Sequence, residues 1–457
     1  MLDAVLKRID DTMPASLDRL MTFLRIDSIS TDPAYKASCQ KAADWLVGEL
    51  TGMGFDAAAR PTKGHPIVVG HHAGDGPHAL FYAHYDVQPP DPLDLWTSPP
   101  FEPQLVTGPD GRKWISGRGS SDDKGQMMTF IEAVRAWKDV TGKLPAGVTV
   151  CLEGEEESGS TNFKPFLEAN AAALRADVGM ICDTGMWSRT RPAITMSLRG
   201  LVGEEITIRA ASRDLHSGMY GSAARNPNHV MAAILAGLHD ADGRVTLPGF
   251  YDGVPETPAE VRKLWDTLGF DPAAFLGEVG LSVPAGETGR SVLEMIWSRP
   301  TAEINGMSGG YTGKGMKTVI PAEAHAKVTF RLVARQDPDK VREAFRAYVR
   351  AQLPSDCTVS FTAHGSGGAI LLPVDGPYMR RARKALADEW GVDPAFMGAG
   401  GSIPVAAAFK EVLGLDALMI GFALDDDRIH SPNEKYDLTS YHGGIRSWAR
   451  ILQALAT

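Results

Sequence analysis

Residues 78–86 read HALFYAHYD, a mostly apolar run that ends in His84 and, two residues later, Asp86. Such a run is typical of a buried β-strand. Similar runs occur at 66–72, 147–154, 176–183 and 416–423, and helical patterns occur at 41–50, 126–137 and 163–174. Because strands alternate with helices, we expect an α/β domain with a mostly parallel sheet that helices cover on both faces.

The middle of the chain follows a different pattern. Segments 204–210, 324–333 and 357–363 alternate apolar and polar residues, as half-exposed strands do, and long helical patterns cover 226–240 and 337–353. We therefore expect a discontinuous α/β domain formed by residues 1–197 and 364–457, interrupted at 198–363 by an inserted α+β domain with helices on one face of a small sheet. Within the insertion, the Gly- and Pro-rich stretch 243–260 predicts an irregular loop.

Composition and charge exclude several classes of protein. The chain has 457 residues, of which 44% are apolar and 22% are charged, as in an ordinary globular protein. It carries 46 Lys and Arg against 56 Asp and Glu, and its net charge of −10 disfavours nucleic acid as a partner. No run approaches about 18 apolar residues and no apolar signal core is present at the start, so we expect neither a membrane span nor secretion. The four cysteines form no CxxC pair, which indicates free thiols and a cytoplasmic location.

Side chains that bind metals follow the predicted strands. These are His84 and Asp86 after the strand at 78–84, Glu155, Glu156 and Glu157 after 147–154, Asp183 at the end of 176–183, and His430 after 416–423. The Gly-rich segment GRGSSDDKG (117–125) adds Asp122 and Asp123 just before a predicted helix. Because ligands of open α/β sheets bind at the carboxyl ends of the strands, we expect these segments to converge. Histidine and carboxylate ligands suit zinc or a similar divalent ion, and carboxylates are able to bridge two ions.

Each of these features has an ordinary structural explanation when it is taken alone. His84 and Asp86 could form a satisfied polar pair, the three glutamates a solvated loop, and Asp183 the cap of a helix. The acidic run 425–427 is interpreted as solvated and without a role. The joint occurrence of the other segments at one edge of the sheet favours the metal site.

Eight motifs resemble those of the carnosinase-like metallodipeptidases, within the larger aminoacylase and succinyl-diaminopimelate desuccinylase group of two-metal amidohydrolases. They are HYDVQP (84–89), GRGSSDDKG (117–125), EEESGS (155–160), DTGMW (183–187), RDLHSGMYGS (213–222), KTVIPAEAHAKVTFRLV (317–333), GGSIPV (400–405) and HSPNEKY (430–436). The resemblance implies two divalent metal ions per chain, zinc with manganese or cobalt as alternatives, which share a water and make hydroxide available at neutral pH. It implies that His84, Asp122 and Asp183 bind one ion and that Asp122, Glu157 and His430 bind the second.

The same resemblance makes Glu156 the general base. Three consecutive glutamates leave the register open, and the following Ser158-Gly159-Ser160 identifies the base and the ligand as Glu156 and Glu157. Glu155 is then interpreted as a solvated carboxylate. Asp86 lies on the same side of an extended segment as His84, so we expect it to accept the other imidazole N–H. The family also implies a cis peptide bond between Asp122 and Asp123.

Three further segments are implied to face the substrate. His216 of the inserted domain resembles a histidine that a partner subunit supplies to polarise the scissile carbonyl, which implies a homodimer formed through an inserted lid and dimerisation domain. Arg331 resembles a clamp for the substrate carboxylate, and Gly401 and Ser402 resemble amide donors to the same group. Without the resemblance, His216 is a surface histidine, Arg331 is an exposed strand arginine, and residues 400–402 form a turn and a helix cap.

The resemblance and these residues together imply a zinc metallopeptidase. It would hydrolyse the peptide bond of dipeptides, or of similar small substrates with a free carboxylate. An N-acyl or N-carbamoyl amino-acid amidohydrolase is the alternative enzyme on the same scaffold. A non-catalytic metal- or peptide-binding protein is the alternative of another class, and the loss of Glu156 or of a ligand would mark it; none is lost here. The side-chain specificity of the substrate stays open.

Overall fold

A computed structural model of the chain describes residues 1–400 and 404–456. These residues divide into two compact units. Unit 1 comprises Met1–Met196, Leu372–Met397 and the segment from Pro404 onward, and unit 2 comprises Ser197–Leu371 with a short return that begins at Gly398. The inserted domain was expected at 198–363. Unit 2 continues further because its last long strand, β14 (Thr358–Gly367), stays paired with β9 (Gly200–Arg209) as far as Gly367.

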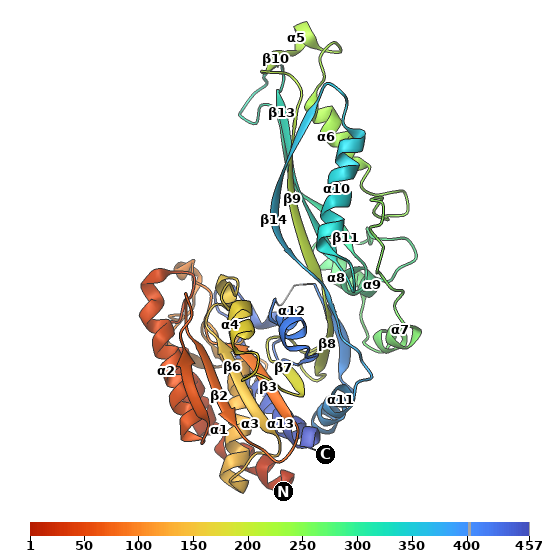
Figure 1. Ribbon diagram of the computed structural model, residues 1–457. Helices are drawn as coiled ribbons and strands as arrows, with labels where there is room; N and C mark the ends of the chain where they lie inside the picture. The colour runs from red at the N-terminus through yellow and green to blue at the C-terminus, as the bar shows by residue number, and fades with distance from the viewer. Residues whose placement is uncertain (401–403, 457) are drawn as a thin grey trace. The chain divides into compact units, whose positions relative to one another are not determined.

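The sheet of unit 1 has the strand order β1-β2-β6-β3-β7-β17-β8, and β16 pairs with β8 (Figure 1). Its strands are β1 (Asp56–Arg60), β2 (Ile67–His72), β3 (His78–His84), β6 (Gly147–Glu153), β7 (Val178–Ile181), β8 (Ala193–Leu198), β16 (Ala395–Ala399) and β17 (Ala417–Met419). The central strands β6, β3, β7 and β17 are parallel, whereas β1, β2 and β8 join antiparallel to a neighbour. The five strands predicted for this domain are confirmed, although β17 is shorter than the apolar run at 416–423.

Helices cover both faces of this sheet. They are α1 (Leu2–Leu24), α2 (Lys36–Gly52), α3 (Lys124–Thr141), α4 (Phe163–Asn170), α11 (Pro377–Trp390), α12 (Pro404–Ala408), the π-helical turn η4 (Phe409–Leu413) and α13 (Leu438–Ala456). On β3, Phe81 stacks on Phe130 of α3 with ring centroids 3.7 Å apart. The next residue, Tyr82, contacts Phe163 of α4. Because successive strand residues point to opposite faces, these contacts place α3 and α4 on opposite sides, as predicted.

Unit 2 is built on a four-stranded antiparallel sheet with the order β11-β13-β9-β14 (Figure 1). Its remaining strands are β11 (Thr301–Ser308) and β13 (Glu323–Leu332), and its two main helices are α6 (Pro227–Ala236) and α10 (Pro338–Gln352). Alternate residues such as Val202, Ile206 and Phe330 point to one face and pack with Phe345 of α10. This confirms the predicted small sheet with helices on one face.

Smaller elements complete the two units. Unit 1 also has the 3-10 turns η1 (Pro33–Tyr35) and η2 (Leu93–Leu95) and a three-stranded sheet of β4 (Gln104–Thr107), β5 (Lys113–Ser116) and β18 (Lys435–Asp437). Unit 2 also has β10 (Leu215–His216), β12 (Val319–Ile320), β15 (Ile370–Leu371) and the short helices α5 (Ser217–Tyr220), α7 (Ala259–Asp266), α8 (Pro272–Gly277) and α9 (Val292–Trp297). The loop predicted at 243–260 leads into α7, which already begins at Ala259.

One buried carboxylate fastens a helix of unit 2 to its sheet. Glu204 of β9 is almost inaccessible to solvent and accepts hydrogen bonds from Arg342 and Arg346 of α10, with Nε–O distances of 3.0 Å from both arginines. The side chain lies on the face of the strand that carries the core, where an unpaired charge would be costly. The two arginines therefore allow an ionised group to sit beneath the helix.

The four cysteines, Cys39, Cys151, Cys182 and Cys357, are all buried free thiols. Burial raises the pKa of Cys39 to about 12, and it raises the pKa of the other three thiols as well. In the part of the chain that the structure describes, no helix is both long enough and apolar enough to cross a membrane.

Candidate metal centre

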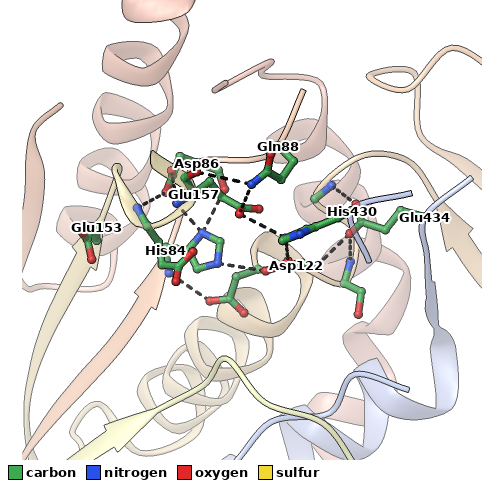
Figure 2. A network of polar contacts seen from close by, with 12 residues as sticks. His84, Asp86, Gln88, Asp122, Glu153, Glu157, His430 and Glu434 are labelled. Atoms are coloured by element: carbon green, nitrogen blue, oxygen red, sulfur yellow. Dashed lines mark hydrogen bonds and ion pairs between the residues drawn. The ribbon is translucent and has the colours of Figure 1, made fainter. Parts of the chain in front are cut away.

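The ends of the parallel strands of unit 1 deliver the predicted ligands to one place (Figure 2). His84 is the last residue of β3, Glu157 lies in the 3-10 turn η3 (Glu156–Ser158) after β6, and Asp183 follows β7. Asp122 comes just before α3, and His430 lies in the loop between η5 (Asp425–Asp427) and β18. Residues up to 346 positions apart in the chain thus meet because parallel strands end at the same edge of a sheet.

Two overlapping groups of metal-binding side chains result. One contains His84, Asp122 and Asp183, the other contains Asp122, Glu157 and His430, and the ligand atoms of each group lie within 4.8 Å of one another. Asp122 belongs to both groups: its Oδ1 lies 3.1 Å from His84 Nε2, and its Oδ2 lies 2.9 Å from His430 Nε2. These are the same two sets that the motifs predicted, with Asp122 shared.

The carboxylate of Asp86 organises the loop after β6. It accepts hydrogen bonds from the backbone N–H groups of Glu156 and Glu157, with N–O distances of 3.2 and 3.0 Å. The same carboxylate lies 3.4 Å from His84 Nδ1, whereas the backbone carbonyl of Asp86 lies closer to that nitrogen, at 3.1 Å. The hydrogen-bond partner of this nitrogen is therefore the backbone carbonyl of Asp86 and not the carboxylate that was expected. The carboxylate instead positions both glutamates, a role that sequence reasoning missed.

Two more polar residues support the ligands and were also missed. Gln88 donates a hydrogen bond of 2.7 Å to Glu157 Oε2, and Glu434 accepts hydrogen bonds from the backbone around Asp122 (Figure 2). Burial raises the pKa of Glu434 to about 7, while Arg118 and the backbone N–H groups act in the opposite direction. Both residues lie inside motifs that the sequence analysis quoted, HYDVQP and HSPNEKY, so the signal was present but carried no assigned role. The predicted cis peptide bond between Asp122 and Asp123 is confirmed.

The side chains at this edge fit a divalent cation. Burial raises the pKa of Asp183 well above its ordinary value, and the charges of Asp122, Glu156 and Glu157 add to that effect while His84 opposes it. Burial likewise raises the pKa of Glu156 to about 7. Among the described residues, the buried Glu157 Oε1 has no hydrogen-bond donor. Converging carboxylates whose basic partners at this edge are two imidazoles form the donor set that a divalent metal ion satisfies.

Two predictions about acidic residues are wrong. Glu155 was interpreted as solvated, but it is buried and accepts a hydrogen bond of 2.8 Å from Asn162. Asp427 was interpreted as solvated with its neighbours, but its carboxylate is fully buried and accepts hydrogen bonds from Ser121 and Lys435, each 2.8–2.9 Å long. Runs of like charge suggest solvent exposure, and only the tertiary structure shows which member of a run turns inward.

The predicted substrate-facing residues lie in unit 2 or outside the described residues. His216 ends β10 and caps α5, with its Nδ1 accepting the N–H of Gly218 at 3.0 Å. Arg331 of β13 is half-buried and lines a cavity of about 910 Å³, together with Arg199, Glu303 and Thr329. Gly401 and Ser402 lie outside the described residues.

An α/β sheet that carries two overlapping His and carboxylate groups at its strand ends defines a metal-dependent hydrolase. The model of peptidase family M20/M25/M40 matches residues 80–454, and the chain belongs to this family. It is 30% identical to the Cys-Gly metallodipeptidase dug1 of Schizosaccharomyces pombe, over 100% of this chain and 98% of the relative. It is 28% identical to the human Beta-Ala-His dipeptidase, over 82% and 74% of the two chains. A solved M20 family metallo-carboxypeptidase, Sso-CP2 from Sulfolobus solfataricus, superposes with a TM-score of 0.80 at 30% identity, covering 96% and 99%.

Proposed function

We propose that this protein is a dipeptidase that uses two divalent metal ions, zinc first of all, to hydrolyse the peptide bond of small substrates with a free carboxylate. One observation carries the proposal: Asp122 faces both His84 and His430 from its two oxygens, so one carboxylate joins two groups of ligands. A single-ion site has no need of a shared carboxylate. Held by these residues, such ions would supply a water whose pKa is near 7 and a Lewis acid for the substrate carbonyl.

Glu156 is the general base in this proposal. Its neighbour Glu157 belongs to a ligand group, whereas Glu156 does not, and both are oriented by the carboxylate of Asp86. A carboxylate of Glu156 accepts the proton of the attacking water and passes it to the nitrogen of the leaving amine. A carboxylate that takes up and then releases one proton serves both steps.

Residues of unit 2 supply substrate recognition. The guanidinium of Arg331 binds the carboxylate of the substrate through paired hydrogen bonds, and the backbone of Gly401 and Ser402 adds donors. His216 polarises the scissile carbonyl in the site of a second copy of the chain, so the active form is a homodimer built through unit 2. The enzyme works in the cytoplasm, where its four cysteines stay reduced.

Relatives support a dipeptide as substrate in preference to an N-acyl amino acid. The S. pombe relative is named a Cys-Gly metallodipeptidase and the human relative a Beta-Ala-His dipeptidase. Sso-CP2, named a metallo-carboxypeptidase, favours a second candidate function, the removal of a C-terminal residue from longer peptides. Both reactions need the same clamp for the C-terminal carboxylate. They differ in whether the site accepts more than one residue on the amino side of the cleaved bond.

A comparison of substrates of increasing length tests the proposal. The protein is stripped with a chelator, reloaded with zinc, manganese or cobalt, and assayed on Cys-Gly, β-Ala-His, a tripeptide, a pentapeptide and an N-acetyl amino acid. We expect no activity without metal, two ions per chain in the active protein, and kcat/KM highest for a dipeptide. Faster cleavage of the N-acetyl substrate or of the pentapeptide would replace the proposal by the corresponding alternative, and full activity with no more than one ion would refute the shared site.

A further inference from the structure

Glu434 is a fully buried carboxylate whose two oxygens accept four hydrogen bonds from one loop. Its Oε2 accepts from Arg118 Nη1 at 2.8 Å and from the N–H of Gly119 at 2.9 Å. Its Oε1 accepts from the N–H groups of Ser121 and Asp122 at 2.8 and 3.0 Å. Loop 117–122 has no strand or helix partner for these N–H groups. The glutamate therefore supplies the hydrogen-bond acceptors that regular secondary structure would otherwise provide.

Glu434 is also only four residues from His430 in the chain. Its own backbone carbonyl accepts the N–H of Gly117 at 3.0 Å, and the next residue, Lys435, pairs with Ser116 in the β18–β5 ladder. One residue thus joins, through side chain and backbone, the loop that delivers Asp122 and the loop that delivers His430.

The loop that carries His430 needs such an anchor. Arg428, His430 and Asn433 have φ values of 58°, 61° and 64°, in the left-handed region that residues other than glycine seldom adopt. Asn433 is held in turn by the backbone around Leu95 and Thr97, with distances of 2.8 and 2.7 Å. Neighbouring contacts therefore determine the backbone conformation that turns His430 toward Asp122.

We propose that Glu434 is a positioning residue for the metal centre: it sets the orientation of the shared Asp122 carboxylate relative to His430, and so the affinity of the ion that these two residues hold together. This inference rests on the proposed two-metal function. Outer hydrogen-bond partners of ligands commonly change metal affinity 10- to 100-fold when they are altered.

The variant Glu434→Gln tests the role with little change in volume. A glutamine keeps one oxygen that accepts two of the four hydrogen bonds. Its NH2 group replaces the other oxygen and faces two N–H donors, so the other two hydrogen bonds are lost and donors face donors. The control is Glu389→Gln: Glu389 of α11 likewise accepts hydrogen bonds from arginine, in its case Arg446 and Arg450 of α13, at 2.5 and 2.6 Å. Both variants weaken a carboxylate–arginine pair within unit 1, and only one of them touches the ligand loops.

Zinc and cobalt affinities are measured by chelator competition, and the cobalt-loaded proteins are compared by visible absorption, with melting temperatures alongside. For Glu434→Gln we expect one of the two ions to bind at least tenfold more weakly, an altered cobalt spectrum, and a lower kcat at unchanged KM that excess metal partly restores. For Glu389→Gln we expect a lower melting temperature with wild-type affinity and spectrum.

The outcomes separate the two proposals. If the wild type itself binds no second ion, the proposed function fails. If the wild type binds two ions and folded Glu434→Gln shows the same affinities and spectrum, Glu434 has no positioning role. If Glu434→Gln does not fold, Arg118→Lys replaces it, since that change leaves the three backbone hydrogen bonds and removes the guanidinium that contacts both Glu434 and the backbone carbonyl of Pro89. An affinity loss smaller than tenfold but measurable supports the inference, and wild-type affinity with a wild-type spectrum overturns it.

Discussion

Glu156 and Glu157 are consecutive residues with different surroundings, and this difference is testable by mutation. Glu156→Gln should keep both ions bound and lower kcat about 10²- to 10⁴-fold, because the water loses its proton acceptor. Glu157→Gln should weaken one ion, since Glu157 belongs to a ligand group and Glu156 does not. Metal content and kcat of the two variants are measured side by side. The reverse pattern would mean that the base and the ligand are exchanged.

At the level of residues, strand ends and the family resemblance together predicted most of the metal centre. His84 and Asp183 stand out because they follow apolar strands, and Glu157 was assigned because Ser158-Gly159-Ser160 follows it as in the family that the motifs resemble. Glu434 and Gln88 were not predictable in the same way. Their roles depend on which backbone N–H or carboxylate lies within hydrogen-bond distance, and neither strand periodicity nor motif spacing contains that information.

The pairing of β9 with α10 gives a prediction at the level of elements. Glu204→Ala should lower the free energy of unfolding by about 3 kcal/mol, which is near the low end of the losses seen when a buried ion pair is broken. The loss is at the low end because Arg342 and Arg346 are partly exposed and regain water. The adjacent Glu205, whose carboxylate contacts His364 on a more exposed part of the strand, is the control. Glu205→Ala should change the free energy by less than about 1 kcal/mol. Urea unfolding of unit 2 measures both, and equal effects would contradict the assignment.

Two histidines near the start of the parallel strands predict a pH dependence of stability. His71 of β2 and His78 of β3 stack at 4.8 Å, and both bind Thr149 Oγ1 at 2.7 Å. Burial and the neighbouring His71 lower the pKa of His78 in the folded state. The unfolded chain therefore binds a proton at this histidine below about pH 6.5, whereas the folded chain binds it only at lower pH. The stabilisation is therefore present above about pH 6.5 and is lost as the pH falls toward the lower folded pKa.

Calorimetry between pH 5 and 8 checks this prediction. The melting temperature of the wild type should fall on acidification, and His78→Gln, which retains a group able to bond Thr149, should show a smaller fall. An identical pH profile for the two proteins would exclude His78 as the source.

Among the elements, long periodic segments were predictable and short ones were not. Strands β3, β6, β9 and β13 and helices α3 and α10 follow patterns that extend over several turns or residue pairs. Helices α7, α8 and α9 have eight, six and six residues and are separated by Gly- and Pro-rich stretches, so no apolar period can repeat within them. Strand β17 ends at Met419 although the apolar run continues. An apolar run predicts that residues are buried, but it does not predict that their backbone is extended.

At the level of the whole molecule, the proposed homodimer predicts complementation between two inactive variants. His216→Ala lacks the histidine that polarises the carbonyl, and Glu156→Gln lacks the base. In a mixed dimer, one site then has both groups and the other has neither. Mixing the two proteins under subunit exchange should restore activity to about half of the wild-type value per mixed dimer. If verified mixed dimers stay inactive, each site uses its own His216 or none.

The buried cysteines predict a simple chemical result. A thiol-specific reagent such as 5,5′-dithiobis(2-nitrobenzoic acid) should modify less than one thiol per native chain, because each side chain is covered and its raised pKa leaves little thiolate at neutral pH. In urea, all four thiols should react. Rapid modification of a thiol in the native protein would show that the packing around it opens readily.

A chain with no reactive thiol of its own is a ready background for site-specific fluorescence labelling. Cysteines introduced at Lys7 of unit 1, whose side chain is 73% exposed, and at Met316 of unit 2, a residue that is 94% exposed, would be the first thiols accessible to a maleimide dye. A donor and an acceptor at these positions would report energy transfer between the two units of a single molecule. The protein could then be watched in solution as metal and substrate are added, without replacing any of its native cysteines.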